Sequence, residues 1–294
     1  MIRAPLASFL IIGLLAGVPA FAADEAYTIK LYKSKKGDKS ENEKTDEAKN
    51  KIAISIMGMN NKQDTDTGKK EIFVEEILEK KDGDKRPTKL TRTYSASEKT
   101  EKGETTKAPY AGETVLIEKK GDKYEFSVKG KALPEDDAPD LHKSFNKAED
   151  EPQNEDFLPK DAVKVGATWK VAADKTEKMF KAFGEDKMKL DAKKSSVGGK
   201  LVKVYKKDGA QFGTLEITID VFVTAIDLGG QFADTKPGSK MTVKAIIDTC
   251  IDGTVNFEDS KLDVKVDLTA DLPNDGSFTI SGTSTGVEKT RAVK

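Results

Sequence analysis

The stretch TLEITIDVFVTAID, residues 214–227, decides the fold of this chain. Apolar and polar side chains alternate along it, so its residues fall into two sets that face opposite ways. The apolar set is Leu215, Ile217, Ile219, Val221 and Val223, and the polar set includes Glu216, Thr218 and Asp220. A period of two is typical of a β-strand with one face buried and the other in water. The stretch therefore predicts a long, half-buried strand.

Three runs with the same alternation follow towards the C-terminus. They are KMTVKAIIDTCI (residues 240–251), KLDVKVDLTADL (261–272) and FTISGTSTGVEKTRAV (278–293). The turn sequence PNDGS, residues 273–277, separates the last two. Strands that follow one another through short connections usually pair as neighbours, so these runs predict an antiparallel meander.

The first half of the chain carries weaker signals of the same kind. Alternation marks strands in AYTIKLYK (residues 26–33) and KIAISIMGM (51–59), and residues 114–128 predict a hairpin with its turn at Lys120-Gly121-Asp122. Two stretches lack any apolar alternation, namely SKKGDKSENEKTDEAKN (34–50) and MNNKQDTDTGKK (59–70). We expect these two stretches to be mobile polar loops.

Helical signals are few. Residues 136–147 and 174–183 each place two apolar side chains on one helical face, and Asp174 can cap the second helix. Long antiparallel strands with one wet face tend to curl until the apolar face is buried. The predicted fold class is therefore mainly β (β-rich α+β): a curved antiparallel sheet that forms a barrel or half-barrel, with a few short helices.

Composition divides the chain into parts. Residues 24–133 form an N-terminal β-rich half, residues 134–157 an acidic connector, and residues 158–294 a C-terminal β-rich half. The connector could bind a cation or a basic partner, but charge runs usually mark solvated segments, and we interpret it as one. Trp169, the only tryptophan, lies just after the connector. It could stack on a ligand, but we favour a core anchor because aromatic rings supply large apolar area.

The N-terminal segment has the three regions of a secretory signal peptide. Arg3 precedes an apolar run from Leu6 to Val18, and small residues follow as far as Ala23. We expect residues 1–23 to be removed by cleavage near Ala22–Ala23, which predicts an exported protein, periplasmic or extracellular, with no transmembrane span in the mature chain. The alternative is an uncleaved membrane anchor, but prolines and glycines interrupt the run.

Charge and cysteine content exclude several classes of protein. The chain has 50 basic and 51 acidic residues, and only four of the basic ones are arginine. Apart from a modest cluster at Lys30–Lys39, no basic face of the kind that nucleic-acid binders show is evident, so we expect no nucleic-acid partner. Cys250 is the single cysteine and lies far from the apolar run. This excludes a lipoprotein anchor and an intramolecular disulfide, so the core must stabilise the fold.

No residue stands out as catalytic. His142 is the only histidine and lies in the acidic connector, so we interpret it as an exposed helix residue. Cys250 has no basic neighbour in sequence, which favours a buried small hydrophobe. Asp64, Asp66 and Glu75 have calcium-loop spacing, but the positions between them do not match, so we expect an ordinary loop. We therefore expect no catalytic residue, cofactor or metal, and no enzyme; a hydrolase built on two of the many carboxylates is the weakest alternative.

One short pattern resembles a known family. Leu-Pro-x-x-x-Val-x-Val-Gly-x-x-Trp, here Leu158 to Trp169, is similar to a pattern in an uncharacterised family of secreted bacterial β-rich proteins. That resemblance covers most of the chain after residue 23 and implies two β-rich halves. In architecture alone, the chain also distantly resembles the periplasmic lipoprotein-carrier fold, whose half-barrel holds acyl chains. No motif residue connects the chain to that activity.

Two hypotheses of function follow from these features. The first is an exported non-enzymatic envelope protein whose curved sheet binds an apolar or amphipathic ligand such as a lipid. The alternative is a structural or interaction protein with a fully packed core that binds another envelope protein through a sheet edge or the acidic connector. Interior space separates the two, because five inward side chains either enclose a cavity of ligand size or fill it: Leu215, Ile217, Val264, Val266 and Phe278.

Overall fold

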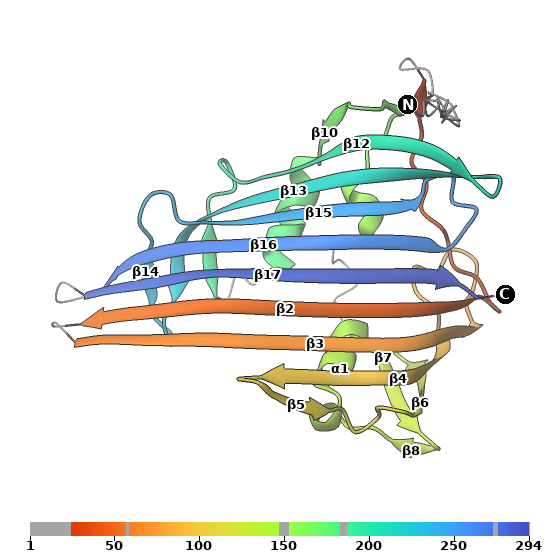
Figure 1. Cartoon of the computed structure of the whole chain (residues 1–294), viewed down its shortest axis with the longest axis horizontal. Helices are drawn as coiled ribbons and strands as arrows, with labels where there is room; N and C mark the ends of the chain where they lie inside the picture. Colours follow the sequence, from red (N-terminus) through yellow and green to blue (C-terminus); the bar gives the residue numbers. More distant parts are fainter. Residues whose placement is uncertain (1–24, 57–58, 147–152, 183–186, 273–275, 294) are drawn as a thin grey trace, which may run out of the picture.

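A large antiparallel sheet forms most of the molecule (Figure 1). The computed structural model describes residues 25–56, 59–146, 153–182, 187–272 and 276–293. Within them the sheet has fifteen strands, and its main path runs β10-β12-β13-β15-β16-β17-β2-β3-β4-β6-β7-β8. β11 and β14 pair with β13, and β5 pairs with β4, while β1 and β9 form a separate two-stranded sheet.

The strands vary widely in length. They are β1 (Ala26–Tyr27), β2 (Lys39–Ile56), β3 (Met59–Glu79), β4 (Lys89–Glu101), β5 (Glu104–Lys107), β6 (Thr114–Lys120), β7 (Lys123–Val128), β8 (Lys131–Ala132), β9 (Val163–Lys164), β10 (Thr168–Lys170), β11 (Met188–Leu190), β12 (Ser196–Lys207), β13 (Ala210–Asp227), β14 (Phe232–Asp234), β15 (Lys240–Cys250), β16 (Phe257–Leu272) and β17 (Gly276–Ala292). The helices are α1 (Pro139–Phe145) and α2 (Ala173–Ala182), with 3₁₀ turns η1 (Glu135–Asp137) and η2 (Asn154–Phe157).

The predicted meander is confirmed. β13, β15, β16 and β17 pair in sequence order, each antiparallel to the one before. Along β13, Leu215, Ile217 and Ile219 are buried, and the polar residues between them are half-buried. The alternation of apolar and polar residues in the sequence thus matches the alternation of buried and half-buried side chains along β13. The hairpin expected over residues 114–128 is also confirmed, as β6 and β7.

The two β-rich halves share one sheet. β17, near the C-terminus, pairs with β2 through sixteen residue pairs, from Ser277–Ser55 to Ala292–Ser40. The path of strands ends at β10 on one side and at β8 on the other, and within the described residues these two strands do not pair. The sheet is therefore open rather than closed, which agrees with the predicted half-barrel and not with a closed barrel.

The expectation of two mobile polar loops is wrong. Residues 34–50 and 59–70 lie largely in β2 and β3, which form a hairpin of eighteen residue pairs. β2 lies between β17 and β3, so its backbone groups have partners on both sides. Backbone pairing is obligatory for any buried N–H and C=O, whatever the side chains are. A strand held on both sides can therefore be polar on both faces, and it then shows no apolar alternation.

Two short α-helices lie on one face of the sheet, behind the strands in Figure 1. Both occur where helices were predicted. α1 is shorter than the range 136–147, and α2 begins one residue early, so Asp174 lies within the first turn instead of capping it. Phe183, expected on the apolar stripe of α2, lies outside the described residues.

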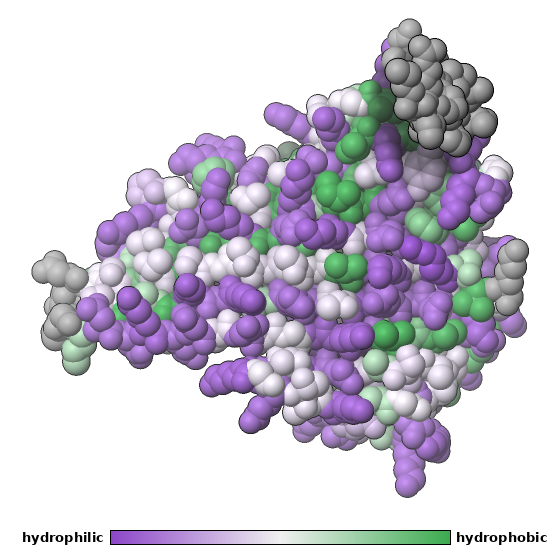
Figure 2. Space-filling view, in the orientation of Figure 1, coloured by the Kyte–Doolittle hydropathy of each residue, from purple (hydrophilic) through white to green (hydrophobic). Residues whose placement is uncertain are grey.

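Each helix covers its own hydrophobic cluster. Leu141 and Phe145 of α1 pack with Phe73 and other side chains of β3, β4, β6 and β7. Met179 of α2 packs with Ile219 and other side chains of β12, β13 and β15. The strand registers place both clusters on the same face of the sheet. Figure 2 shows the opposite face, which is mainly hydrophilic.

Trp169 is a core anchor, as expected. It is half-buried and contacts both the α2 cluster and a neighbouring cluster that contains Tyr27 and Leu201. Its indole Nε1 donates a hydrogen bond to the carbonyl oxygen of Phe157 at 2.8 Å. The ring lies against Gly199, where a Cβ atom would overlap it. The tryptophan thus fixes the end of the connector to β12.

Several predicted sequence features lie wholly or partly outside the described residues. The expected signal peptide, residues 1–23, is one of them. The turn at residues 273–277 is described only from residue 276, and the acidic connector lacks a description of residues 147–152.

Candidate functional site

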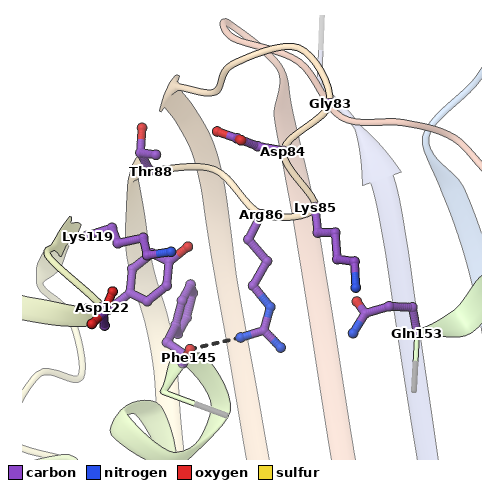
Figure 3. A pocket seen from close by; sticks show the side chains of 10 residues that line it. Gly83, Asp84, Lys85, Arg86, Thr88, Lys119, Asp122, Phe145 and Gln153 are labelled. Atoms are coloured by element: carbon purple, nitrogen blue, oxygen red, sulfur yellow. Dashed lines mark hydrogen bonds between the residues drawn. The ribbon is translucent and has the colours of Figure 1, made fainter. Parts of the chain in front are cut away.

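A cleft opens at one end of the sheet, beside the loop that joins β3 to β4. Its larger part, of about 840 Å³, lies between residues 32–36, the loop at 80–85, η2 and α2. Its smaller part, of about 330 Å³, lies between that loop, the β6–β7 hairpin and Phe145 of α1 (Figure 3). The two parts share wall residues and form one continuous hollow: Gly83, Asp84, Lys85 and Gln153.

The walls of this cleft are rich in basic side chains, and we call it the lysine cleft. Among the residues that the structure describes, nine basic ones line it: Lys33, Lys35, Lys36, Lys80, Lys81, Lys85, Arg86, Lys119 and Lys175. Five acidic ones in the same described part line it: Asp82, Asp84, Asp122, Glu155 and Asp156. The excess of four positive charges contrasts with a net charge of −1 for the whole chain. The cleft is therefore a local positive region on a chain that is otherwise nearly neutral.

One of the five acids is already paired within the cleft. Asp156 lies 2.7 Å from the amino nitrogen of Lys175 and accepts a hydrogen bond from the backbone N–H of Gln153 at 2.9 Å. The hydrogen bond from Lys175 and that from Gln153 lower the pKa of Asp156, although burial opposes them. This acid and Lys175 thus neutralise each other, and the excess charge belongs to the remaining basic residues.

Side-chain hydrogen bonds hold the two walls of the larger part together. Lys80 donates from Nζ to the hydroxyl of Ser34 at 2.9 Å, which ties the loop to residues 32–36. The hydroxyl of Tyr32 donates to Asp38 at 2.8 Å. Burial, together with that hydrogen bond, raises the pKa of Tyr32 to about 12, so this hydroxyl stays a neutral donor. Gly83, with φ +87°, makes the turn that brings the loop back.

Arg86 lies in the smaller part. Its Nη1 donates to the carbonyl oxygen of Phe145 at 2.8 Å, which connects the loop to the end of α1. Figure 3 shows this bond and, beside it, Lys85 with its amino group directed towards Gln153. A guanidinium has five N–H donors in a fixed fork. The bond to Phe145 anchors one nitrogen of that fork in the wall of the cleft.

The five inward side chains that were to separate the two hypotheses lie in packed clusters. Leu215 and Ile217 are buried, and Val264 packs against the α2 cluster. Phe278 is buried in a further cluster, against which Val266 packs. Val266 also lines a shallow hollow of about 780 Å³, but the other walls of that hollow are mainly polar and charged residues of β2, β3, β16 and β17. These five side chains thus mainly fill the interior of packed hydrophobic clusters.

A charged band crosses the helix-covered face between the two hydrophobic clusters. Lys44 of β2 lies 2.5 Å from Glu288 of β17, and Lys69 of β3 lies 2.9 Å from Asp140 of α1. Burial, and secondarily the neighbouring Glu288, raises the pKa of Glu258 in β16. The band interrupts the apolar surface in the middle of the sheet, so the two clusters do not form one continuous apolar groove.

His142 is not the exposed residue that was expected. It is half-buried, and its Nε2 lies 3.0 Å from the carbonyl oxygen of Leu133. Its ring centre lies 4.2 Å from that of Phe126 in β7. The wrong expectation came from the acidic composition around it, which gave no sign that α1 lies against β7. The side chain connects α1 to the sheet and lines neither part of the lysine cleft.

Cys250 is buried, as expected, on the outer face of the sheet beside Phe212. Its thiol donates to the carboxylate of Asp252 at 3.0 Å, and the backbone N–H of Val255 donates to its sulfur at 3.4 Å. The thiol thus helps to hold the turn between β15 and β16. Sequence reasoning did not foresee these polar contacts.

The three residues with calcium-loop spacing lie in β3 and not in a loop. Asp64 and Asp66 have the opposite parity to Glu75, so they face the other side of the sheet, and Glu75 is ion-paired with Arg92 at 2.9 Å. They cannot converge on one ion. Within the part of the chain that the structure describes, no group of three or more His, Cys, Asp and Glu residues could hold a metal. No helix in that part is long and apolar enough to span a membrane.

No protein-family model matches the chain, and no curated relative does. Solved structures with weak similarity include an outer membrane channel from Pseudomonas putida F1, with 7% identity, 90% of this chain and 98% of that chain covered, and a TM-score of 0.21. Another is the outer membrane protease OmpT from Escherichia coli, with 9% identity, 87% and 97% coverage, and a TM-score of 0.19. Scores this low say nothing about the function of the chain.

Proposed function

We propose that this chain is an exported, non-enzymatic envelope protein that acts by binding at its surface while its interior is filled. One observation carries the proposal: the lysine cleft is lined by charged side chains, whereas the inward apolar residues pack against one another. A binding site needs accessible concave surface, and here that surface is polar. The export pattern of residues 1–23 and the resemblance of Leu158–Trp169 to secreted β-rich proteins support a place in the envelope.

An apolar ligand held by the sheet has less support. Such a ligand needs a continuous apolar trough, and the charged band of Lys44, Glu288, Lys69 and Asp140 divides the helix-covered face. The absence of an enzyme activity is supported by the roles of the reactive side chains. His142 and Cys250 both hold neighbouring segments in place through hydrogen bonds.

The test is native mass spectrometry of the protein purified from its own cell envelope and washed at high salt. High salt screens ionic contacts but leaves apolar burial intact, so it removes surface-bound anions and retains acyl chains. We expect protein without lipid after the wash, and chemical cross-linking before the wash should capture a bound partner. A stoichiometric lipid that survives the wash would contradict the proposal and support a carrier of apolar ligands.

A further inference from the structure

We propose that the lysine cleft binds a compact ligand with several phosphate groups. The inference rests on the proposed function, since it names the ligand class of the surface site. It starts from the charge of the cleft, which is lined, among the described residues, by nine basic and five acidic side chains. In a chain with a net charge of −1, such an excess in one concave region does not follow from composition. A cleft lined by one sign of charge concentrates ligands of the opposite sign.

The positive side chains come from segments far apart in sequence. Residues 32–36 contribute lysines, and the β3–β4 loop contributes Lys80, Lys81, Lys85 and Arg86. The hydrogen bond from Lys80 to Ser34 joins these segments directly. Like charges repel, so bringing them together costs free energy unless a ligand or counter-ions offset it. In the folded chain these side chains nevertheless lie together at one end of the sheet.

The walls are held in place before any ligand arrives. Arg86 is fixed by the carbonyl oxygen of Phe145, and Tyr32 by Asp38. Lys33, Lys36 and Lys81 are exposed, and within the described residues their side chains form no hydrogen bond or ion pair. Fixed walls with exposed, unpaired amino groups suit a ligand whose charges can be met from several directions, because a lysine ammonium acts as a point charge on a long stem.

Phosphate fits this cleft better than an apolar or singly charged group. A phosphate monoester carries about two negative charges near neutral pH, so two such groups match an excess of about four positive charges. The larger part measures about 840 Å³, which lies within the size range of small-molecule sites. Arginine can meet phosphate with two parallel hydrogen bonds, and lysine meets it as a point charge. A free oligophosphate and a phosphate-bearing lipid headgroup share this chemistry.

The test compares two fourfold variants of the full chain. The cleft variant carries Lys33→Gln, Lys36→Gln, Lys81→Gln and Lys85→Gln, all at exposed positions. The matched control carries the same four charge losses at exposed lysines elsewhere: Lys131→Gln, Lys170→Gln, Lys200→Gln and Lys206→Gln. Tripolyphosphate is titrated calorimetrically at low salt, and flotation is measured with phosphatidylcholine vesicles that do or do not contain phosphatidic acid. Circular dichroism confirms that both variants are folded.

We expect the wild-type chain to bind at least one probe, the cleft variant to bind it about tenfold or more weakly, and the control to match the wild type. Binding should weaken with salt, less steeply in the cleft variant. Tripolyphosphate binding indicates a free anion, and binding of phosphatidic acid vesicles alone indicates a headgroup. No binding by the wild type, or equal losses in both variants, would overturn the inference. A cross-linked partner retained by the cleft variant would then leave the proposed function intact.

Discussion

The indole ring of Trp169 lies so close to Gly199 that a Cβ atom added there would overlap the ring. The two residues are paired across β10 and β12, where the ring covers the backbone of the neighbouring strand. We expect Gly199→Ala to lower the free energy of unfolding by about 1–3 kcal/mol, since an added methyl group in a packed site forces its neighbours to move. Urea unfolding measured by tryptophan fluorescence checks this directly.

Gly68→Ala is the matched control for that change. Gly68 also lies in a strand, but a Cβ there would meet its nearest atoms at 3.7 Å, an ordinary contact distance. We expect a change within about 0.5 kcal/mol of zero. If both variants lose the same free energy of unfolding, the loss comes from replacing a strand glycine in general. It would then not come from contact with the ring of Trp169.

A second prediction concerns the ion pair beneath α1. Arg92 lies 2.9 Å from Glu75 and places its guanidinium 4.5 Å from the ring centre of Phe73 and 4.8 Å from that of Phe145. Both charged side chains are more than three-quarters shielded from solvent. Glu75→Gln leaves this guanidinium without its counter-charge, so we expect a loss of about 1–3 kcal/mol in urea unfolding.

The neighbouring residue supplies the control. Glu76→Gln removes the partner of Lys39, but that pair is 3.7 Å apart and both side chains are 45% exposed. Exposed pairs are screened by water and salt, so we expect a loss of at most about 0.5 kcal/mol. A loss at Glu76 as large as the loss at Glu75 would show that burial beneath α1 is not what makes the Arg92 pair important.

How much of the fold the sequence reveals depends on where each strand is buried. β13 lies between covered neighbours on its apolar face, so selection for burial leaves a period of two that can be read directly. β2 and β3 extend beyond the covered part of the sheet, and their outer ends carry residues such as Lys49, Asp64 and Asp66. β17 lies more than 200 residues after β2 in the chain and holds β2 in the sheet, and a neighbour so distant in sequence leaves no local pattern.

The candidate site was only half visible in the sequence for a similar reason. The cluster at Lys30–Lys39 is evident in the sequence, but the acidic residues that follow it balance its charge. The sheet then separates those acids from the lysines, because they enter β2 while residues 32–36 turn towards the β3–β4 loop. The lysine cleft is thus a product of topology. Local composition alone could predict the lysine-rich segments, but not that the fold brings residues 32–36 next to the β3–β4 loop.

A third prediction concerns the carboxylate in the turn after β15. Asp252 accepts hydrogen bonds from the thiol of Cys250 at 3.0 Å and from the backbone N–H of Gln211 at 2.7 Å. Burial alone would raise the pKa of Asp252, but the hydrogen bonds from Cys250, Thr254 and Gln211 outweigh it and lower the pKa. A lowered pKa means that the charged form stabilises the fold above the unfolded-state value of about 3.8, and that this is lost as pH falls through the folded-state value.

Asp252→Asn should therefore destabilise the protein by about 1–2 kcal/mol at neutral pH, as expected for hydrogen bonds to a charged group. The difference from the wild type should shrink as the pH falls below about 4, in urea unfolding curves measured across pH. Asp208→Asn, in the exposed turn between β12 and β13, should show little effect at any pH. A difference that stays constant with pH would assign the role to the shape of the side chain and not to its charge.

For Glu258, in the charged band, we expect a pH dependence of stability opposite to that of Asp252. Burial, and then the neighbouring Glu288, raises the pKa of Glu258, so its charged form is less favourable in the folded state than in the unfolded state. Stability should fall as pH rises from the unfolded-state value of about 4.3 through the raised folded-state value, because the folded state holds the proton longer. Glu258→Gln removes this effect, so the variant should be more stable than the wild type at neutral pH and should lose that advantage in acid.

Unfolding curves at several pH values check this loss of advantage, with Glu47→Gln at an exposed position as the control. If Glu258→Gln is less stable than the wild type at neutral pH, the carboxylate contributes more through its hydrogen bonds than it costs through burial.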